Sequence, residues 1–67
     1  MGKVEKAELM AEEVKVALVR KGMTQQKLAE ICGINPQTLS NHLTVRQVPF
    51  EGTYEKYLKI IDKYIKL

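Results

Sequence analysis

Neutral hydrogen-bonding side chains gather in the middle of this chain. Gln37 and Asn41 each carry a carboxamide that both donates and accepts hydrogen bonds, and their spacing of four residues places them on one face of a helix. The hydroxyls of Ser40 and Thr44 fall on or beside the same face. Such a face favours recognition of a polar surface through neutral donors and acceptors.

Groups that support catalysis are not recognisable in the sequence. No nucleophile has a nearby base, no pair of carboxylates shares a plausible cleft, and no glycine-rich loop is suited to phosphate. One cysteine and one histidine cannot form a zinc site within a single chain, and a lone cysteine excludes an intrachain disulfide and suits a reducing cytosol. We therefore expect a protein that is not an enzyme and that binds no metal or cofactor.

Two side chains of reactive types, a cysteine and a histidine, are more simply explained as packing residues. Cys32 shares an apolar stripe with Leu28, which predicts a small buried hydrophobe rather than a reactive thiol. His42 lies beside Leu39 and Leu43, so we expect it to pack with one ring nitrogen hydrogen-bonded, rather than to bind a metal or act as a pH switch.

The polar face requires a helix to carry it, and residues 24–44 predict two short helices joined by a tight turn. Thr24 is placed to cap the first helix, and Gly33 can end it in the left-handed conformation. Asn35 is a good cap for the second helix, and Pro36 fits its first position because that N–H has no intrahelical partner.

Two longer helices are predicted on either side of this unit. The first spans residues 3–21 and ends at Gly22, with an apolar stripe formed by Val4, Ala7, Met10, Ala11, Val14, Ala17 and Leu18. Residues 45–52 predict a loop, after which Thr53 is expected to cap a last helix that runs to the C-terminus. Its stripe consists of Tyr54, Tyr57, Leu58, Ile61, Tyr64 and Ile65. With no strand, repeat or linker in the pattern, we expect one all-α, four-helix domain over residues 1–67.

Charge and length narrow the classes of partner. The chain has 67 residues and a formal net charge of +3, which is divided evenly among residues 1–21, 22–48 and 49–67. This mild basic bias is compatible with nucleic acid, but the middle third has only Lys27 and Arg46 as cations, so any binding there must rely on neutral groups. No apolar run approaches a membrane span or a signal-peptide core, and we expect a cytoplasmic protein that contacts no membrane.

From Val14 to Pro49 the sequence resembles the Cro/cI-type, or XRE, family of lambda-repressor-like helix-turn-helix proteins. The family pattern LAxxxGI(S/N)xxT(I/L)SxxL is matched by Leu28, Ala29, Gly33, Ile34, Asn35, Thr38, Leu39, Ser40 and Leu43. The lead-in at residues 21–25 is similar to the family's KG(L/M)(T/S)Q. The resemblance implies a small transcriptional regulator, a repressor of the phage or mobile-element type encoded by a bacterium or phage, with double-stranded DNA as its partner.

The resemblance also implies roles for individual residues. A helix over residues 36–43 enters the major groove, with base edges read by Gln37, Thr38, Ser40 and Asn41. The DNA backbone is held by Gln25, Lys27, Thr44, Arg46 and Gln47. Because the chain has no room for an effector domain, we expect no small-molecule effector.

One departure from the family predicts a contact. Relatives often have an arginine at the position of Leu18 and a glutamate at that of Leu43, which form an ion pair. Replacing a buried pair entirely by apolar residues is often neutral or stabilising, whereas losing one partner is costly. We therefore predict that the Leu18 and Leu43 side chains touch.

The quaternary state follows from the shortness of the reading helix. One such helix reads few base pairs, so a homodimer on a pseudo-palindromic operator is expected. We place its contact on the last helix, at Tyr57, Ile60, Tyr64 and Leu67.

A function of another class stays open at this point. The chain is alternatively a helical protein-interaction module, antitoxin-like or anti-repressor, that keeps the fold and reads no DNA. Apolar residues off the expected core stripes favour this alternative: Leu9, Val16, Val19 and Ile31. The neutral amide face counts against it, since a protein-binding groove typically carries aromatic or aliphatic anchors.

Overall fold

Four α-helices make up the regular structure. The computed structural model describes residues 2–50 and 52–65. In chain order the helices are α1 (Lys3–Lys21), α2 (Gln25–Cys32), α3 (Pro36–Leu43) and α4 (Thr53–Lys63). The described part of the chain contains no β-strand, which confirms the all-α, four-helix prediction. No helix within these residues is long and apolar enough to cross a membrane.

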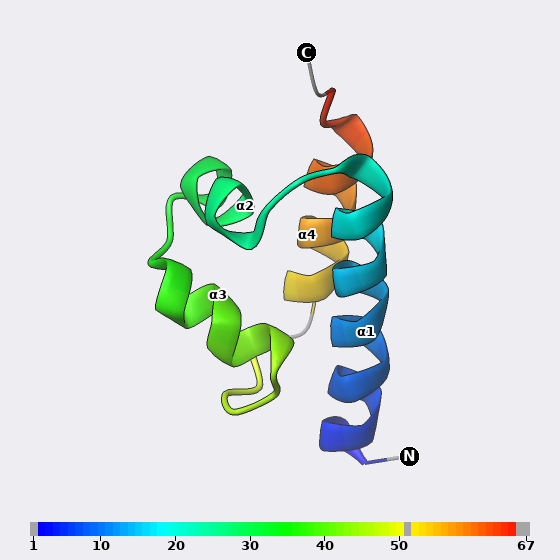
Figure 1. The fold of residues 1–67 in the computed structure, drawn as a ribbon. Coiled ribbons are helices and arrows are strands. Elements are labelled where there is room, and N and C mark those ends of the chain that lie inside the picture. The colour runs from blue at the N-terminus through cyan, green and yellow to red at the C-terminus, as the bar shows by residue number, and fades with distance from the viewer. Residues whose placement is uncertain (1, 51, 66–67) are drawn as a thin grey trace.

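Helices α1 and α4 lie side by side and run in the same direction (Figure 1). Near their starts, Met10 of α1 and Tyr54 of α4 line one hollow. At their other ends, Nζ of Lys21 donates a hydrogen bond to the main-chain carbonyl of Asp62 at 3.0 Å. The pair α2 and α3 packs against these two helices, so each short helix has one covered side and one open side.

The core consists of one apolar cluster to which all four helices contribute. Its largest fully buried side chains are Val14, Leu28, Leu39, Leu43 and Ile61. The predicted stripe of α1 is confirmed at Ala7, Ala11, Val14 and Leu18, and Met10 and Ala17 pack against the cluster from its edge.

Val4 was expected in this stripe, and that prediction is wrong. Its side chain is 53% exposed. Helix α4 begins level with Lys6 and Met10, whose side chains share a hollow with Gly52, so α4 does not reach the first turn of α1.

The predicted contact between Leu18 and Leu43 is consistent with this core. Both side chains are buried in the same cluster, and α1 packs against α3. The two positions therefore hold apolar side chains in an apolar surrounding, where neither leaves a charge without a partner.

The tight turn between α2 and α3 has the predicted caps. The Oγ1 atom of Thr24 accepts a hydrogen bond from the Lys27 N–H at 3.0 Å, which satisfies one free donor at the start of α2. Gly33 has φ of 70°, and the next N–H, that of Ile34, reaches back to the Ala29 carbonyl at 3.0 Å. This arrangement ends α2 and aims the chain into α3.

Both ends of α4 differ from the prediction. Thr53 is the first helical residue rather than the cap, because Gly52, with φ of 89°, takes the cap position in a left-handed conformation that a β-branched residue disfavours. The helix ends at Lys63 instead of continuing to the C-terminus, and Tyr64 is extended. Helix α1 has already ended at Lys21, whose ammonium bonds the Asp62 carbonyl near the end of α4, so α4 has no further turn of α1 beside it.

We predict that Gly33→Ala lowers the free energy of unfolding by about 1 to 2 kcal/mol, because an L side chain disfavours the left-handed conformation. An added Cβ at Gly33 meets no atom within 4 Å, so the cost is that of the backbone alone. Gly33→Asn, which tolerates this conformation better, should cost less. Urea unfolding of the three proteins checks the order, and an alanine variant as stable as the parent would contradict it.

Candidate nucleic-acid interface

Helix α3 is fixed in its orientation by its start and by its apolar side. Asn35 Oδ1 accepts a hydrogen bond from the Gln37 N–H at 2.8 Å, and Pro36 occupies the first turn, both as predicted. Leu39 is fully buried and Leu43 is 1% exposed. Since these two side chains anchor one side of α3, the opposite side is presented outward.

The outward side carries the predicted amide pair, and its two members are bonded to each other. Nε2 of Gln37 donates a hydrogen bond to Oδ1 of Asn41 at 3.1 Å. The bond leaves Oε1 of Gln37 as a free acceptor and the NH2 group of Asn41 as a free donor. Thr38 and Ser40, also predicted to read bases, are half-buried next to this pair. The bond therefore holds the two amides together and leaves an acceptor on one and a donor on the other.

The main chain after α3 folds back onto the same helix. The N–H groups of Arg46 and Gln47 both donate to the carbonyl of Asn41, at 3.0 and 3.2 Å. Val45, between them and the helix, has φ of 60°, which is rare for a β-branched residue. Backbone strain of this kind persists only where the surrounding structure enforces it. The turn holds the exposed side chains of Arg46 and Gln47 at the C-terminal end of α3.

The other residues predicted to hold the DNA backbone differ in how freely they can do so. Gln25 and Lys27 are exposed in the first turn of α2. Lys27 Nζ lies 3.7 Å from a carboxylate oxygen of Glu30, an exposed pairing that costs little to break. Thr44 Oγ1 donates to the Ser40 carbonyl at 2.9 Å, so its proton is already used within α3. Thr44 is therefore the least suited of these residues to donate to a phosphate.

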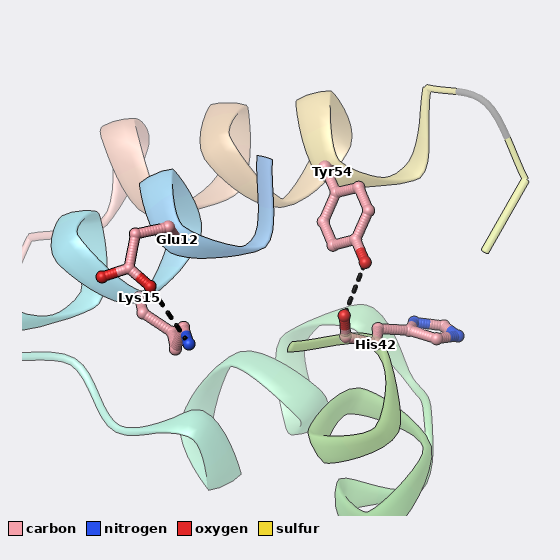
Figure 2. A network of polar contacts seen from close by, with 4 residues as sticks. All are labelled: Glu12, Lys15, His42 and Tyr54. Atoms are coloured by element: carbon pink, nitrogen blue, oxygen red, sulfur yellow. Dashed lines mark hydrogen bonds and ion pairs between the residues drawn. The ribbon is translucent and has the colours of Figure 1, made fainter. Parts of the chain in front are cut away.

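His42 is buried on the inner side of α3 and joins it to α4. Its Nδ1 atom lies 2.8 Å from the hydroxyl of Tyr57, and the two rings stack with centroids 6.1 Å apart. The hydroxyl of Tyr54 donates to the main-chain carbonyl of His42, while the imidazole extends away from that carbonyl (Figure 2). The prediction of a packed histidine with one satisfied nitrogen is confirmed.

This attachment also changes the assignment of Tyr57. Its side chain is 3% exposed, so the prediction that it contacts a second copy is wrong. The helical pattern marked Tyr57 as apolar but did not show which of its neighbours would cover it. Of the other three residues assigned to that contact, Ile60 and Tyr64 are half-buried against the core, and Leu67 lies outside the described residues.

Burial shifts the pKa values of the groups around this attachment. It lowers the pKa of His42, because a buried imidazolium loses hydration, and it raises the pKa of Tyr57. Burial likewise raises the pKa of the Cys32 thiol, with an opposing effect from the nearby Lys56 ammonium. Cys32 packs against the core edge, so the structure agrees with its interpretation as a packing residue rather than a reactive thiol.

Sequence reasoning overlooked Phe50. It is the only phenylalanine of the chain, and its side chain is 92% exposed in the loop that leads into α4. An aromatic residue between two helix breakers, Pro49 and Gly52, was the available signal, because a loop side chain there has no stripe to join.

Comparison of the chain with family models, with curated proteins and with solved structures finds no match. Within residues 2–50 and 52–65, no three side chains of His, Cys, Asp or Glu lie close enough together to hold a metal ion.

We predict that the protein becomes less stable as the pH falls from about 7.5 to 5. This interval lies mostly above the pKa values of carboxylates, so the titration of histidine dominates it. His42 is the only histidine, and its pKa in the folded state lies below the ordinary 6.5. The unfolded chain then binds more protons than the folded chain as the pH falls through 6.5, so the free energy of unfolding decreases.

Urea unfolding across this range checks the slope, and the His42→Gln variant should lose most of it. An NMR titration of the His42 ring in the parent protein should give a pKa below 6.5. A ring that titrates above this value, or a parent protein whose stability rises on acidification, would contradict the prediction.

Proposed function

We propose that this chain is a sequence-specific transcriptional regulator that binds double-stranded DNA and reads the major groove with α3. The observation that carries the proposal is the division of α3 into two sides. Leu39 and Leu43 fix one side in the core, and the bonded pair of Gln37 and Asn41 stands on the other. A helix fits the major groove, where donor and acceptor patterns distinguish all four base pairs.

The bonded amide pair suits this task energetically. A free glutamine side chain loses rotamer freedom when it contacts a base. In α3 the Gln37 amide is already held by Asn41, so part of this rotamer freedom is lost when the protein folds and no longer opposes binding to a base. The free acceptor and donors of the pair then match the acceptor and donor edge of an adenine, a contact worth about 1 to 3 kcal/mol of discrimination.

The grip on phosphates is proposed to come from the ends of the two short helices. Gln25 and Lys27 begin α2, and Arg46 and Gln47 follow α3 in the folded-back turn. With a net charge of only +3, the electrostatic part of binding is modest. We extend the proposal to a lambda-repressor-like arrangement of the four helices, in which α2 and α3 form the helix-turn-helix, and to a role as a small repressor of the phage or mobile-element type.

A protein-interaction module is the second candidate. The four apolar residues that the sequence placed off the core stripes are exposed: Leu9, Val16, Val19 and Ile31. They favour a protein partner because α1 carries three of them. The outward side of α3 favours DNA more, since its exposed groups are amides and hydroxyls without an aromatic or aliphatic anchor.

We predict that Gln37→Ala and Asn41→Ala each relax base preference at one or two positions of the preferred sequence, by about 1 to 3 kcal/mol. Selection from random duplexes followed by competition binding measures this. Because the two amides are bonded, the double variant should lose less than the sum of the single losses. Gln26→Ala, which removes an exposed amide from α2, is the control and should keep the same preferred sequence.

We predict a different effect for Arg46→Ala. Loss of a phosphate contact should weaken binding to all duplexes alike and reduce the slope of log affinity against log salt by about 1. Lys59→Ala removes the same charge from α4, where Lys59 lines a groove with Arg20 and Asp62, and should leave the slope unchanged. Failure of the parent protein to select any sequence at low salt would refute DNA reading and favour the interaction module.

A further inference from the structure

Phe50 is the most exposed large apolar side chain of the described residues, at 92%. Its main chain is held in place, since the Phe50 carbonyl accepts the Thr53 N–H at 3.1 Å, at the start of α4. An aromatic side chain on a fixed backbone loses little freedom when it is buried by a partner, and such residues often dominate the energy of interfaces.

A hollow lies directly beside Phe50. Its volume is about 350 Å³, and it is lined by residues on both sides of Phe50 in the sequence, Pro49 and Gly52. Its walls are mostly apolar, with Ala7 and Met10 from α1 and Tyr54 from α4. Phe50 does not fill this hollow in its own chain, because almost its entire side chain is exposed.

The described residues that line the hollow include a cation and an anion. Lys6 lines it from α1 and Glu55 from α4, and both residues are exposed. Projection and hollow therefore occupy one continuous patch, which also bears a cation and an anion. A patch that carries both a projection and a hollow, and both a cation and an anion, can complement a second copy of itself under a two-fold rotation, which places the same surface of two subunits face to face.

We propose that a second copy of this chain docks on this patch, and that Phe50 of each copy enters the hollow beside Pro49 of the other. In the same arrangement Lys6 of each copy faces Glu55 of the other, so the rim charges pair reciprocally. Val48, 43% exposed at the edge of the hollow, adds apolar surface to the contact. We favour a second copy of the chain as the partner because one patch supplies both the projecting Phe50 and the hollow that would receive it.

This interface does not depend on DNA binding. The lining of the hollow comes from α1, the loop and α4, and it includes no residue of α3. The polar side of α3 takes no part in the proposed contact, so substitutions at Gln37 and Asn41 should leave dimerisation without DNA unchanged. The proposal also moves the dimer contact from the C-terminal half of α4 to its N-terminal end.

Sedimentation of the full chain without DNA, over a concentration series that reaches the high micromolar range, tests the proposal. The parent protein should show a monomer–dimer equilibrium, and Phe50→Asp should raise its dissociation constant at least about tenfold. Val19→Asp is the matched control. Val19 is 81% exposed but does not line the hollow, so this variant should dimerise like the parent protein. Both substitutions are at exposed side chains, and circular dichroism verifies that each variant folds.

The rim charges supply a test that only contact between two copies can satisfy. Lys6→Glu and Glu55→Lys should each dimerise several-fold more weakly, because each creates two like-charge contacts. An equimolar mixture of the two variants should associate more tightly than either alone, since both contacts become attractive in the mixed dimer. A monomeric parent at every concentration, a Phe50→Asp variant that dimerises like the parent, or a mixture no tighter than its components would overturn the proposal.

Discussion

Burial of the apolar side of α3 is the constraint on which the rest of the structure depends. An isolated helix of eight residues is not stable in water, so α3 exists because Leu39 and Leu43 are held in the core formed with the other three helices. The same burial decides which side of α3 faces outward. Any substitution that lets α3 rotate would move Gln37 and Asn41 together, whatever their own chemistry. The recognition proposed for α3 would therefore depend on core packing as much as on the polar residues themselves.

The polar contacts inside the domain refine this packing rather than replace it. Tyr54 and Tyr57 reach from α4 to a single residue of α3, His42, one through its carbonyl and one through its ring. A buried polar group is costly unless it is hydrogen-bonded, and among the described residues no buried side-chain nitrogen or oxygen lacks a partner. Two directional contacts allow fewer alternative positions of α3 than leucine packing alone, because a hydrogen bond has a preferred angle as well as a distance.

Local signals in the sequence were sufficient to predict the bounds and caps of the first three helices. They were insufficient to predict which side chains would be covered by residues distant in the chain. Thr24, Gly33 and Asn35 act on residues close to them in the chain, so their roles were predicted correctly. Tyr57 was assigned to a surface because periodicity gives the face of a helix but not which element will cover it. The polar residues of α3 were placed outward correctly, whereas the bond between two of them and the folded-back turn at Arg46 depend on three-dimensional geometry. Phe50 belongs to no periodic segment, so the sequence could mark it as a loop residue, whereas the hollow beside it depends on how α1 and α4 pack.

The turn at Val45 has a consequence for how two copies would be spaced. The chain after α3 is tied to that helix by the N–H groups of Arg46 and Gln47, and the carbonyl of Phe50 is tied to the start of α4. In a dimer held together through Phe50, the length of this loop would set the distance between the two α3 helices. Adding or removing a residue between Gln47 and Pro49 would change the separation and the relative rotation of the two reading faces, while each face stayed intact. If α3 reads DNA and the chain dimerises as proposed, base preference and half-site spacing would be set by different parts of the chain, and each could change without the other.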